Sequence, residues 1–132
     1  MTDRTSALNA WLALEREAVW LYPLIGARVA ATADTARASL SAHQRSRDRL
    51  LAELGTDNST RARAAYEVPP LTNVEQAQDT ARDLERRIQA ACATAIGASA
   101  GSQRTLPLTG LRTAALAELT WGASPRAFPG LT

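Results

Sequence analysis

Several ionisable residues occupy positions that a helical repeat places on an apolar, inward-facing stripe. Glu15 stands among apolar residues spaced three and four apart, and His43 and Arg47 lie one turn apart on a second stripe. Glu85 and Glu118 lie at the edges of two further stripes. Buried charges are unfavourable unless they are paired or bound to a metal. The pattern therefore predicts a polar site inside a helical bundle, with at least one inward ionisable group from each helix.

The first interpretation of this site is a buried ionic network formed by Glu15, His43, Arg47 and Glu85. Arg47 would pair with one of the two carboxylates, because arginine keeps its charge and offers a planar fork of donors, and His43 would donate to the other. This interpretation includes no catalytic residue and no cofactor. It also predicts that Arg47→Ala is strongly destabilising, because a buried carboxylate would lose its partner.

The second interpretation is a metal site. Di-iron bundles use a Glu from each of two helices and a Glu-x-x-His motif from each of the other two. The available ligands for iron or manganese are Glu15, His43, Glu85 and Glu118. Each Glu-x-x-His motif is only half present, because Leu40 precedes His43 by three residues and Trp121 follows Glu118 by three. The charge of Arg47 beside a metal is also unfavourable. The sequence therefore favours the ionic network and a protein that is not an enzyme.

Composition and periodicity predict an all-α fold of one domain, residues 1–132. The chain has 132 residues, of which 28 are Ala; all 15 basic residues are Arg, and aromatic residues make up only 5%. Apolar residues recur at helical spacing over about residues 6–31, 34–54, 73–97 and 106–122. The long 56–72 segment between the second and third helices would let them run parallel. In the irregular tail, 123–132, we expect Phe128 to anchor the chain on the bundle.

The composition also excludes several classes of protein. The single Cys and single His exclude an internal disulfide framework and a zinc-finger site. No apolar run is long enough to cross a bilayer and the first residues lack a secretory signal, so we expect a cytoplasmic protein with no membrane partner. With a net charge of +2 and no block of like charge, a nucleic-acid partner is not expected. Nucleic-acid binding through exposed arginines is a weaker alternative, and the residues concerned would be Arg37, Arg45, Arg49, Arg61 and Arg63.

A possible contact surface lies on the first helix, where Trp20 and Leu24 stand opposite the apolar stripe. One interpretation is a homodimer interface, because large aromatic side chains on a helix surface contribute strongly to such contacts. The other is burial of both residues beneath the long 56–72 segment. The sequence leaves these two interpretations open.

A family resemblance rests on short motifs that follow one another along nearly the whole chain. On the first helix these motifs are Leu14-Glu15, Val19-Trp20, Tyr22 and Gly26-Ala27-Arg28. Further along they are Ala42-His43, Arg47-Asp48, the Tyr66-to-Pro70 segment, Leu84-Glu85, Trp121 and Phe128-Pro129-Gly130-Leu131. Their order and spacing resemble a ferritin-like family of Ala-rich proteins of unassigned function from high-GC Gram-positive bacteria.

This resemblance implies a ferritin-like four-helix bundle with a long crossover between the second and third helices. The ferritin-like superfamily implies oxidation or storage of iron, and the residues that match its ligand positions are Glu15, His43, Glu85 and Glu118. Because Leu40 and Trp121 depart from the ligand pattern, we expect an incomplete di-iron constellation. The expected protein is a non-catalytic binding or structural homodimer, and the alternative is a metal-binding protein or oxidoreductase with a degenerate site.

Overall fold

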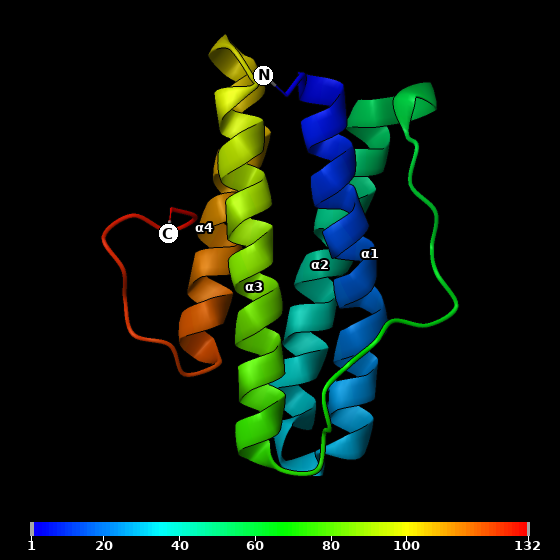
Figure 1. Cartoon of the computed structure of the whole chain (residues 1–132), viewed down its shortest axis with the longest axis vertical. Helices are drawn as coiled ribbons and strands as arrows, with labels where there is room; N and C mark the ends of the chain where they lie inside the picture. Colours follow the sequence, from blue (N-terminus) through cyan, green and yellow to red (C-terminus); the bar gives the residue numbers. More distant parts are fainter. Residues whose placement is uncertain (1, 132) are drawn as a thin grey trace.

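Four long helices lie side by side and form a bundle in the computed structural model, which describes residues 2–131 (Figure 1). The helices are α1 (Arg4–Arg28), α2 (Ala33–Leu54), α3 (Val74–Gly97) and α4 (Thr105–Thr120). Short 3-10 turns follow the first three helices: η1 (Ala30–Thr32), η2 (Gly55–Asp57) and η3 (Gly101–Arg104). α1 packs mainly against α2 and α3, and α4 packs mainly against α3. The predicted all-α bundle is confirmed.

The chain between α2 and α3 returns along the outside of the bundle, so these two helices run in the same direction (Figure 1). This confirms the predicted long connection, which the structure places over residues 58–73. A four-helix bundle with one such crossover has the connectivity of ferritin-like folds. None of the helices within residues 2–131 combines the length and apolar character needed to cross a membrane.

The ends of the helices follow from local capping. Asp3 caps α1, because its Oδ1 accepts the backbone N–H of Ser6 at 2.8 Å. Asn73 caps α3 in the same way through the backbone N–H of Gln76. α1 therefore begins two residues before the predicted start, and it ends at Arg28 because the chain tightens into η1. The prediction for α4 was two residues too long at its C-terminal end.

The crossover is fastened to α1. The side chain of Asn9 donates to the Asp57 carbonyl and accepts the Ser59 N–H, which fixes the start of the segment. Further along, the Tyr66 ring lies 5.3 Å from the Trp20 ring, measured between centroids. Trp20 and Leu24 are both only half-buried. The crossover thus covers part of the surface that was considered for a homodimer contact.

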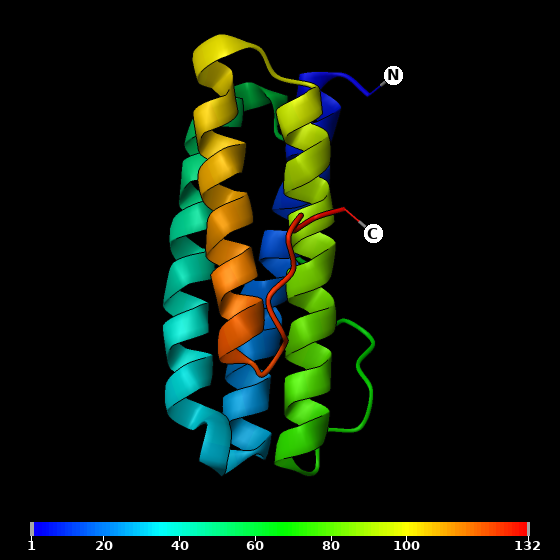
Figure 2. The same cartoon turned by 90° about the vertical axis from the view of Figure 1, so that its left-hand side faces the viewer.

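The tail after α4 doubles back along α3 and α4 (Figure 2). The expected anchor, Phe128, is 72% exposed, so that prediction was wrong. The tail is held instead by Arg126, whose guanidinium donates to Gln89 and Glu118. Gly130, at φ +85°, lies close to the Gln89 carbonyl, and this approach leaves no room for a β-carbon. The last residue of the predicted tail, 132, lies outside the described residues.

Candidate functional site: a buried Glu–His–Glu triad

Three ionisable side chains from three helices meet in the core of the bundle. They are Glu15 on α1, His43 on α2 and Glu85 on α3, and each is at most 1% exposed. The His43 Nδ1 atom lies 2.5 Å from Oε2 of Glu15, and its Nε2 atom lies 2.5 Å from Oε1 of Glu85. The imidazole is therefore clamped between two carboxylates, and we call these three residues the Glu–His–Glu triad.

Each triad residue lies on the buried, mainly apolar side of its helix. On α3, for example, Glu85 lies between the fully buried Leu84 and Ile88. Burial of the apolar residues orients the helix, and a polar residue on the same side then points into the core. The sequence prediction that Glu15, His43 and Glu85 face inward together is consistent with this arrangement.

Two aromatic residues of α1 supply hydrogen bonds to the carboxylates. The indole Nε1–H of Trp11 donates to Oε1 of Glu15 at 2.8 Å. The hydroxyl of Tyr22 donates to Oε1 of Glu85 at 2.7 Å. Burial, together with the nearby charge of Glu85, raises the pKa of Tyr22 well above 10, so that its phenol stays protonated and remains a donor.

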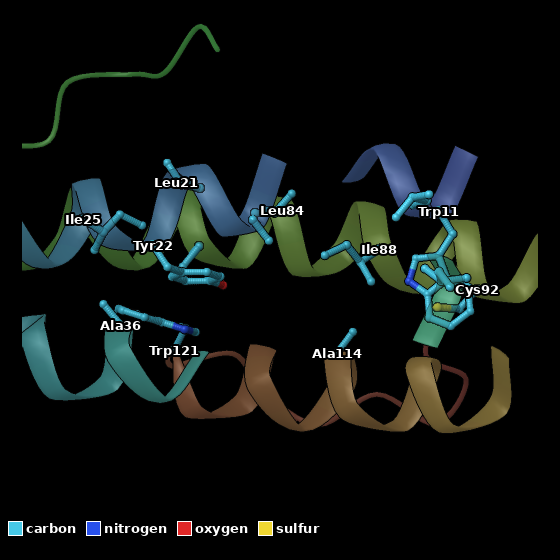
Figure 3. Close-up of a cluster of buried hydrophobic side chains, with 14 of the residues drawn as sticks. Trp11, Leu21, Tyr22, Ile25, Ala36, Leu84, Ile88, Cys92, Ala114 and Trp121 are labelled. Atoms are coloured by element: carbon cyan, nitrogen blue, oxygen red, sulfur yellow. The ribbon is translucent and has the colours of Figure 1, made fainter. Parts of the chain in front are cut away.

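The rings around His43 form a stack that closes one side of the triad. The Tyr22 ring lies 5.5 Å from the His43 ring at an interplanar angle of 8°. The other stacking partner of Tyr22 is Trp121, at 5.8 Å and 21° (Figure 3). The Trp121 indole is itself fixed by a hydrogen bond from its Nε1–H to Ser39 Oγ at 3.1 Å. This aromatic packing excludes water from one side of the triad.

His43 is an imidazolium in this environment. Burial favours the neutral ring, but the charges and hydrogen bonds of Glu15 and Glu85 outweigh it and raise the pKa of His43 from 6.5 to about 10. Both ring nitrogens therefore carry protons near neutral pH and donate to the two carboxylates. Near neutral pH the ring is therefore a charged link between α1, α2 and α3.

Not every buried polar atom of the triad has a hydrogen-bond partner. With both carboxylates ionised and His43 protonated, its formal charge is −1. Among the residues that the structure describes, Oε2 of Glu85 has no hydrogen-bond partner. The donors from Trp11 and Tyr22 offset part of the excess negative charge.

Arg47 is not part of this network, contrary to the sequence prediction. Its side chain is 27% exposed, and its Nε donates to the neighbouring Asp48 at 3.1 Å. The reason lies in the phase of α2, whose buried stripe runs through His43, Ser46 and Leu50. Position 47 therefore stands at the edge of the stripe, where a long side chain reaches solvent.

This correction reverses the expected effect of Arg47→Ala. An exposed ion pair between neighbouring residues contributes little, so we expect the free energy of unfolding to change by less than about 1 kcal/mol. Urea unfolding of the variant and the parent protein measures this difference. A loss of about 3 kcal/mol or more would show that Arg47 compensates a buried carboxylate after all.

Glu118 belongs to a different cluster, between α3, α4 and the tail. Its Oε2 accepts from Arg86 Nε at 2.5 Å, and its Oε1 accepts from Gln89 and Arg126 at 2.9 Å each. Burial tends to raise the pKa of Glu118, but the Gln89 hydrogen bond and the two arginines lower it overall. The structure therefore brings Glu15, His43 and Glu85 together and leaves Glu118 apart from them.

The arrangement does not fit the iron or manganese site that a ferritin-like fold implies. Both ring nitrogens of His43 already lie 2.5 Å from a carboxylate oxygen, so neither faces an open position between the carboxylates. Glu118 is neutralised by Arg86 and Arg126. Within residues 2–131, no three His, Cys, Asp or Glu side chains are grouped so that they would hold a metal ion.

The raised pKa of His43 predicts how stability depends on pH. Below pH 6.5 the ring is protonated in both the folded and unfolded states, and its full contribution is present. Between pH 6.5 and about 10 only the folded protein keeps the proton, so the free energy of unfolding falls as the pH rises. Above that window the contribution is lost. Urea unfolding at several pH values in the window tests this, and His43→Leu should show a clearly flatter profile.

The aromatic and amide partners of the two clusters were not predicted from the sequence. No hydrogen-bonding or stacking role in the site was predicted for Trp11, Tyr22, Trp121 or Gln89. The spacing of Trp11 and Glu15, one helical turn apart, was a usable signal, because such a pair shares one face of a helix. The partners of Glu118 had no such signal, since Arg126 lies in an irregular segment.

Fold and site together define an all-α four-helix bundle whose centre holds an ionic triad. The family described as "Domain of unknown function (DUF4439)" matches residues 7–132, and the chain belongs to this family. The predicted membership of a family of unassigned function is thereby confirmed.

A crystal structure of a conserved hypothetical protein, rv2844, from Mycobacterium tuberculosis is similar to this chain with a TM-score of 0.82. The sequences are 21% identical, and the match covers 94% of each chain. At this identity the likeness establishes a shared fold. No curated protein matches the chain.

Proposed function

We propose that this protein is a ferritin-like bundle without catalytic activity, which acts as a binding or structural homodimer. In it, the Glu–His–Glu triad replaces the metal centre. One observation carries the proposal: the two ring nitrogens of His43 are both used, each 2.5 Å from a carboxylate oxygen. A protonated ring supplies the positive charge that a metal would otherwise bring to the carboxylates. The single crossover between α2 and α3 supports the ferritin-like assignment.

Metal analysis combined with NMR tests the absence of a metal centre. The protein would be purified from cells grown with added iron and manganese, and its metal content measured against protein concentration. We expect less than stoichiometric metal and, near neutral pH, ¹⁵N shifts of His43 typical of an imidazolium. Stoichiometric iron or manganese that is lost in Glu15→Ala would overturn the proposal and support a metal-binding protein or oxidoreductase with a degenerate site.

The homodimer is supported by apolar side chains that the fold leaves in solvent. On α4, Leu108 is 52% and Leu116 57% exposed, and only Arg112 carries a charge on the outer side between them. A surface with few charges and several large apolar side chains is typical of an interface core. The side chains of Leu108 and Leu116 are more exposed than those of Trp20 and Leu24, the predicted interface residues, which are half-buried.

Sedimentation equilibrium over a range of micromolar concentrations tests the homodimer. We expect a dimer that Leu116→Glu converts to a monomer and that Trp20→Ala leaves intact. Dissociation by Trp20→Ala alone would move the interface to the Trp20–Leu24 surface. A parent protein that stays monomeric throughout would refute the homodimer.

A further inference from the structure

A groove of about 340 Å³ lies between α1, α3 and the last part of the crossover. Figure 1 shows this part of the crossover passing across α1 to the start of α3. The groove is lined by Glu17 of α1, by residues 67–70 of the crossover, and by Asp79, Asp83 and Arg87 of α3. The three α3 residues are spaced four apart, so the helix places them on one side. The groove shares no residue with the Glu–His–Glu triad or with the α4 face proposed for the homodimer.

One cation in the groove serves two carboxylates. The Nη1 and Nη2 atoms of Arg87 donate to Glu17 at 3.2 and 2.6 Å, and its Nε donates to Asp83 at 3.0 Å. This guanidinium links α1 to α3, and all three of its nitrogens are used by the two carboxylates. The three side chains together therefore carry a formal charge of −1.

The other two carboxylates of the groove add to this negative charge. Asp79 pairs with Arg82, so the two cancel. Glu67 is exposed and makes no ion pair with the residues that the structure describes. The groove and its partners thus have a formal charge of −2, whereas the whole chain has a net charge of +2. The side chains of Asp79 and Asp83 are 61% and 70% exposed, so their oxygens are accessible to a molecule from solvent.

The accessible lining between these carboxylates is mainly apolar. Val68 is half-buried and packs against the core, and Pro69 and Pro70 follow it along the crossover. The two prolines hold this part of the chain in an extended path. A wall that is already fixed in the free protein loses little conformational entropy when a ligand binds. The groove therefore combines a fixed apolar wall with an excess of negative charge.

We propose that this groove binds a small organic cation, which consists of an ammonium group on an apolar body. The ammonium group would donate to Glu67 and to the exposed carboxylates of α3, while the apolar body packs against the prolines of the crossover. Hydrogen bonds between charged partners are stronger than neutral ones, and the negative potential of the groove attracts cations. The volume is at the lower end of small-molecule sites, which suits a compact amine. This site is independent of the proposed function.

NMR titration of the full-length, ¹⁵N-labelled protein with phenethylamine tests the proposal. Two comparison probes are 2-phenylethanol, which lacks the charge, and methylamine, which lacks the apolar body. At constant pH and ionic strength, we expect phenethylamine to cause saturable shifts that are confined to backbone amides around the groove. Each comparison probe should bind about tenfold more weakly or worse, because one of the two contributions is missing. Equal binding of 2-phenylethanol, or no saturable shift with phenethylamine, would overturn the proposal.

Matched charge removals locate the binding site. Glu67→Gln should weaken phenethylamine binding about threefold to fivefold, in the range of an exposed ion pair, and the exposed position should tolerate the change. Asp57→Asn removes the same charge from an exposed position before the crossover and should leave binding unchanged. Equal weakening by both variants, or shifts spread over carboxylates on the whole surface, would overturn the proposal. Tighter binding of a lysine-rich peptide than of phenethylamine would also overturn it, in favour of a peptide partner.

Discussion

Replacing His43 with leucine is expected to lower the free energy of unfolding by about 3–5 kcal/mol. The substitution removes the only positive charge between the carboxylates of Glu15 and Glu85, which lie at 2.5 Å from its ring nitrogens. Two buried carboxylates would then face each other without a cation, and the leucine could not donate to either. Urea unfolding near neutral pH measures the loss.

A neutral version of the whole triad is the control for this experiment. With Glu15→Gln and Glu85→Gln added to His43→Leu, the buried charges disappear together, and we expect most of the lost stability to return. Replacing every member of a buried ionic group is often neutral or stabilising, whereas removing one partner is strongly destabilising. If His43→Leu alone is as stable as the parent protein, the imidazolium does not hold the triad together.

Gly110→Ala is expected to lower the free energy of unfolding by about 2 kcal/mol or more. At Gly110, α4 packs closely against the Trp11 side chain. This side chain extends into the core from α1 (Figure 3). A β-carbon at position 110 would lie 2.2 Å from Trp11 Cζ2 and 3.0 Å from the sulfur of Cys92. Trp11 is buried and donates to Glu15, so it cannot move away without breaking that hydrogen bond.

Gly97→Ala is the matched control for this prediction. Gly97 ends α3, and apart from its chain neighbours and the adjacent helix backbone no atom lies within 4 Å of a β-carbon built there. Alanine also favours the helix over glycine by about 1 kcal/mol. We therefore expect Gly97→Ala to be neutral or slightly stabilising under the same urea titration. Equal effects of the two variants would contradict the close packing of α4 on Trp11.

The core of the site was predictable from the sequence because polar residues interrupted apolar stripes. Glu15, His43 and Glu85 stand out in this way, and stripes over long helices fix which side faces inward. Arg47 was assigned wrongly because it lies at the edge of its stripe. At such an edge, a difference of one residue decides whether a side chain lies in the core or in solvent. The structure buries Ser46 and leaves Arg47 partly exposed.

The remaining parts of the structure depend on contacts that leave no periodic signal. The tail has no helical repeat, so hydrophobicity alone suggested Phe128 as its anchor, whereas a guanidinium from Arg126 provides it. In the same way, the sequence placed Glu118 on an inward face but did not show which cations reach it. Long-range pairing of this kind is determined by three-dimensional packing rather than by local pattern.

The parallel course of α2 and α3 has a consequence for how the protein folds. Because α1 with α2 and α3 with α4 are joined by short connections, each pair is a helical hairpin that forms from local contacts. The triad joins them, since His43 belongs to the first hairpin and Glu85 to the second. The His43–Glu15 hydrogen bond lies within the first hairpin, whereas the His43–Glu85 hydrogen bond forms only when the two hairpins dock. The length of the 58–73 segment sets the entropy of that step. The ring of His43 is therefore a natural reporter of hairpin docking in a kinetic experiment.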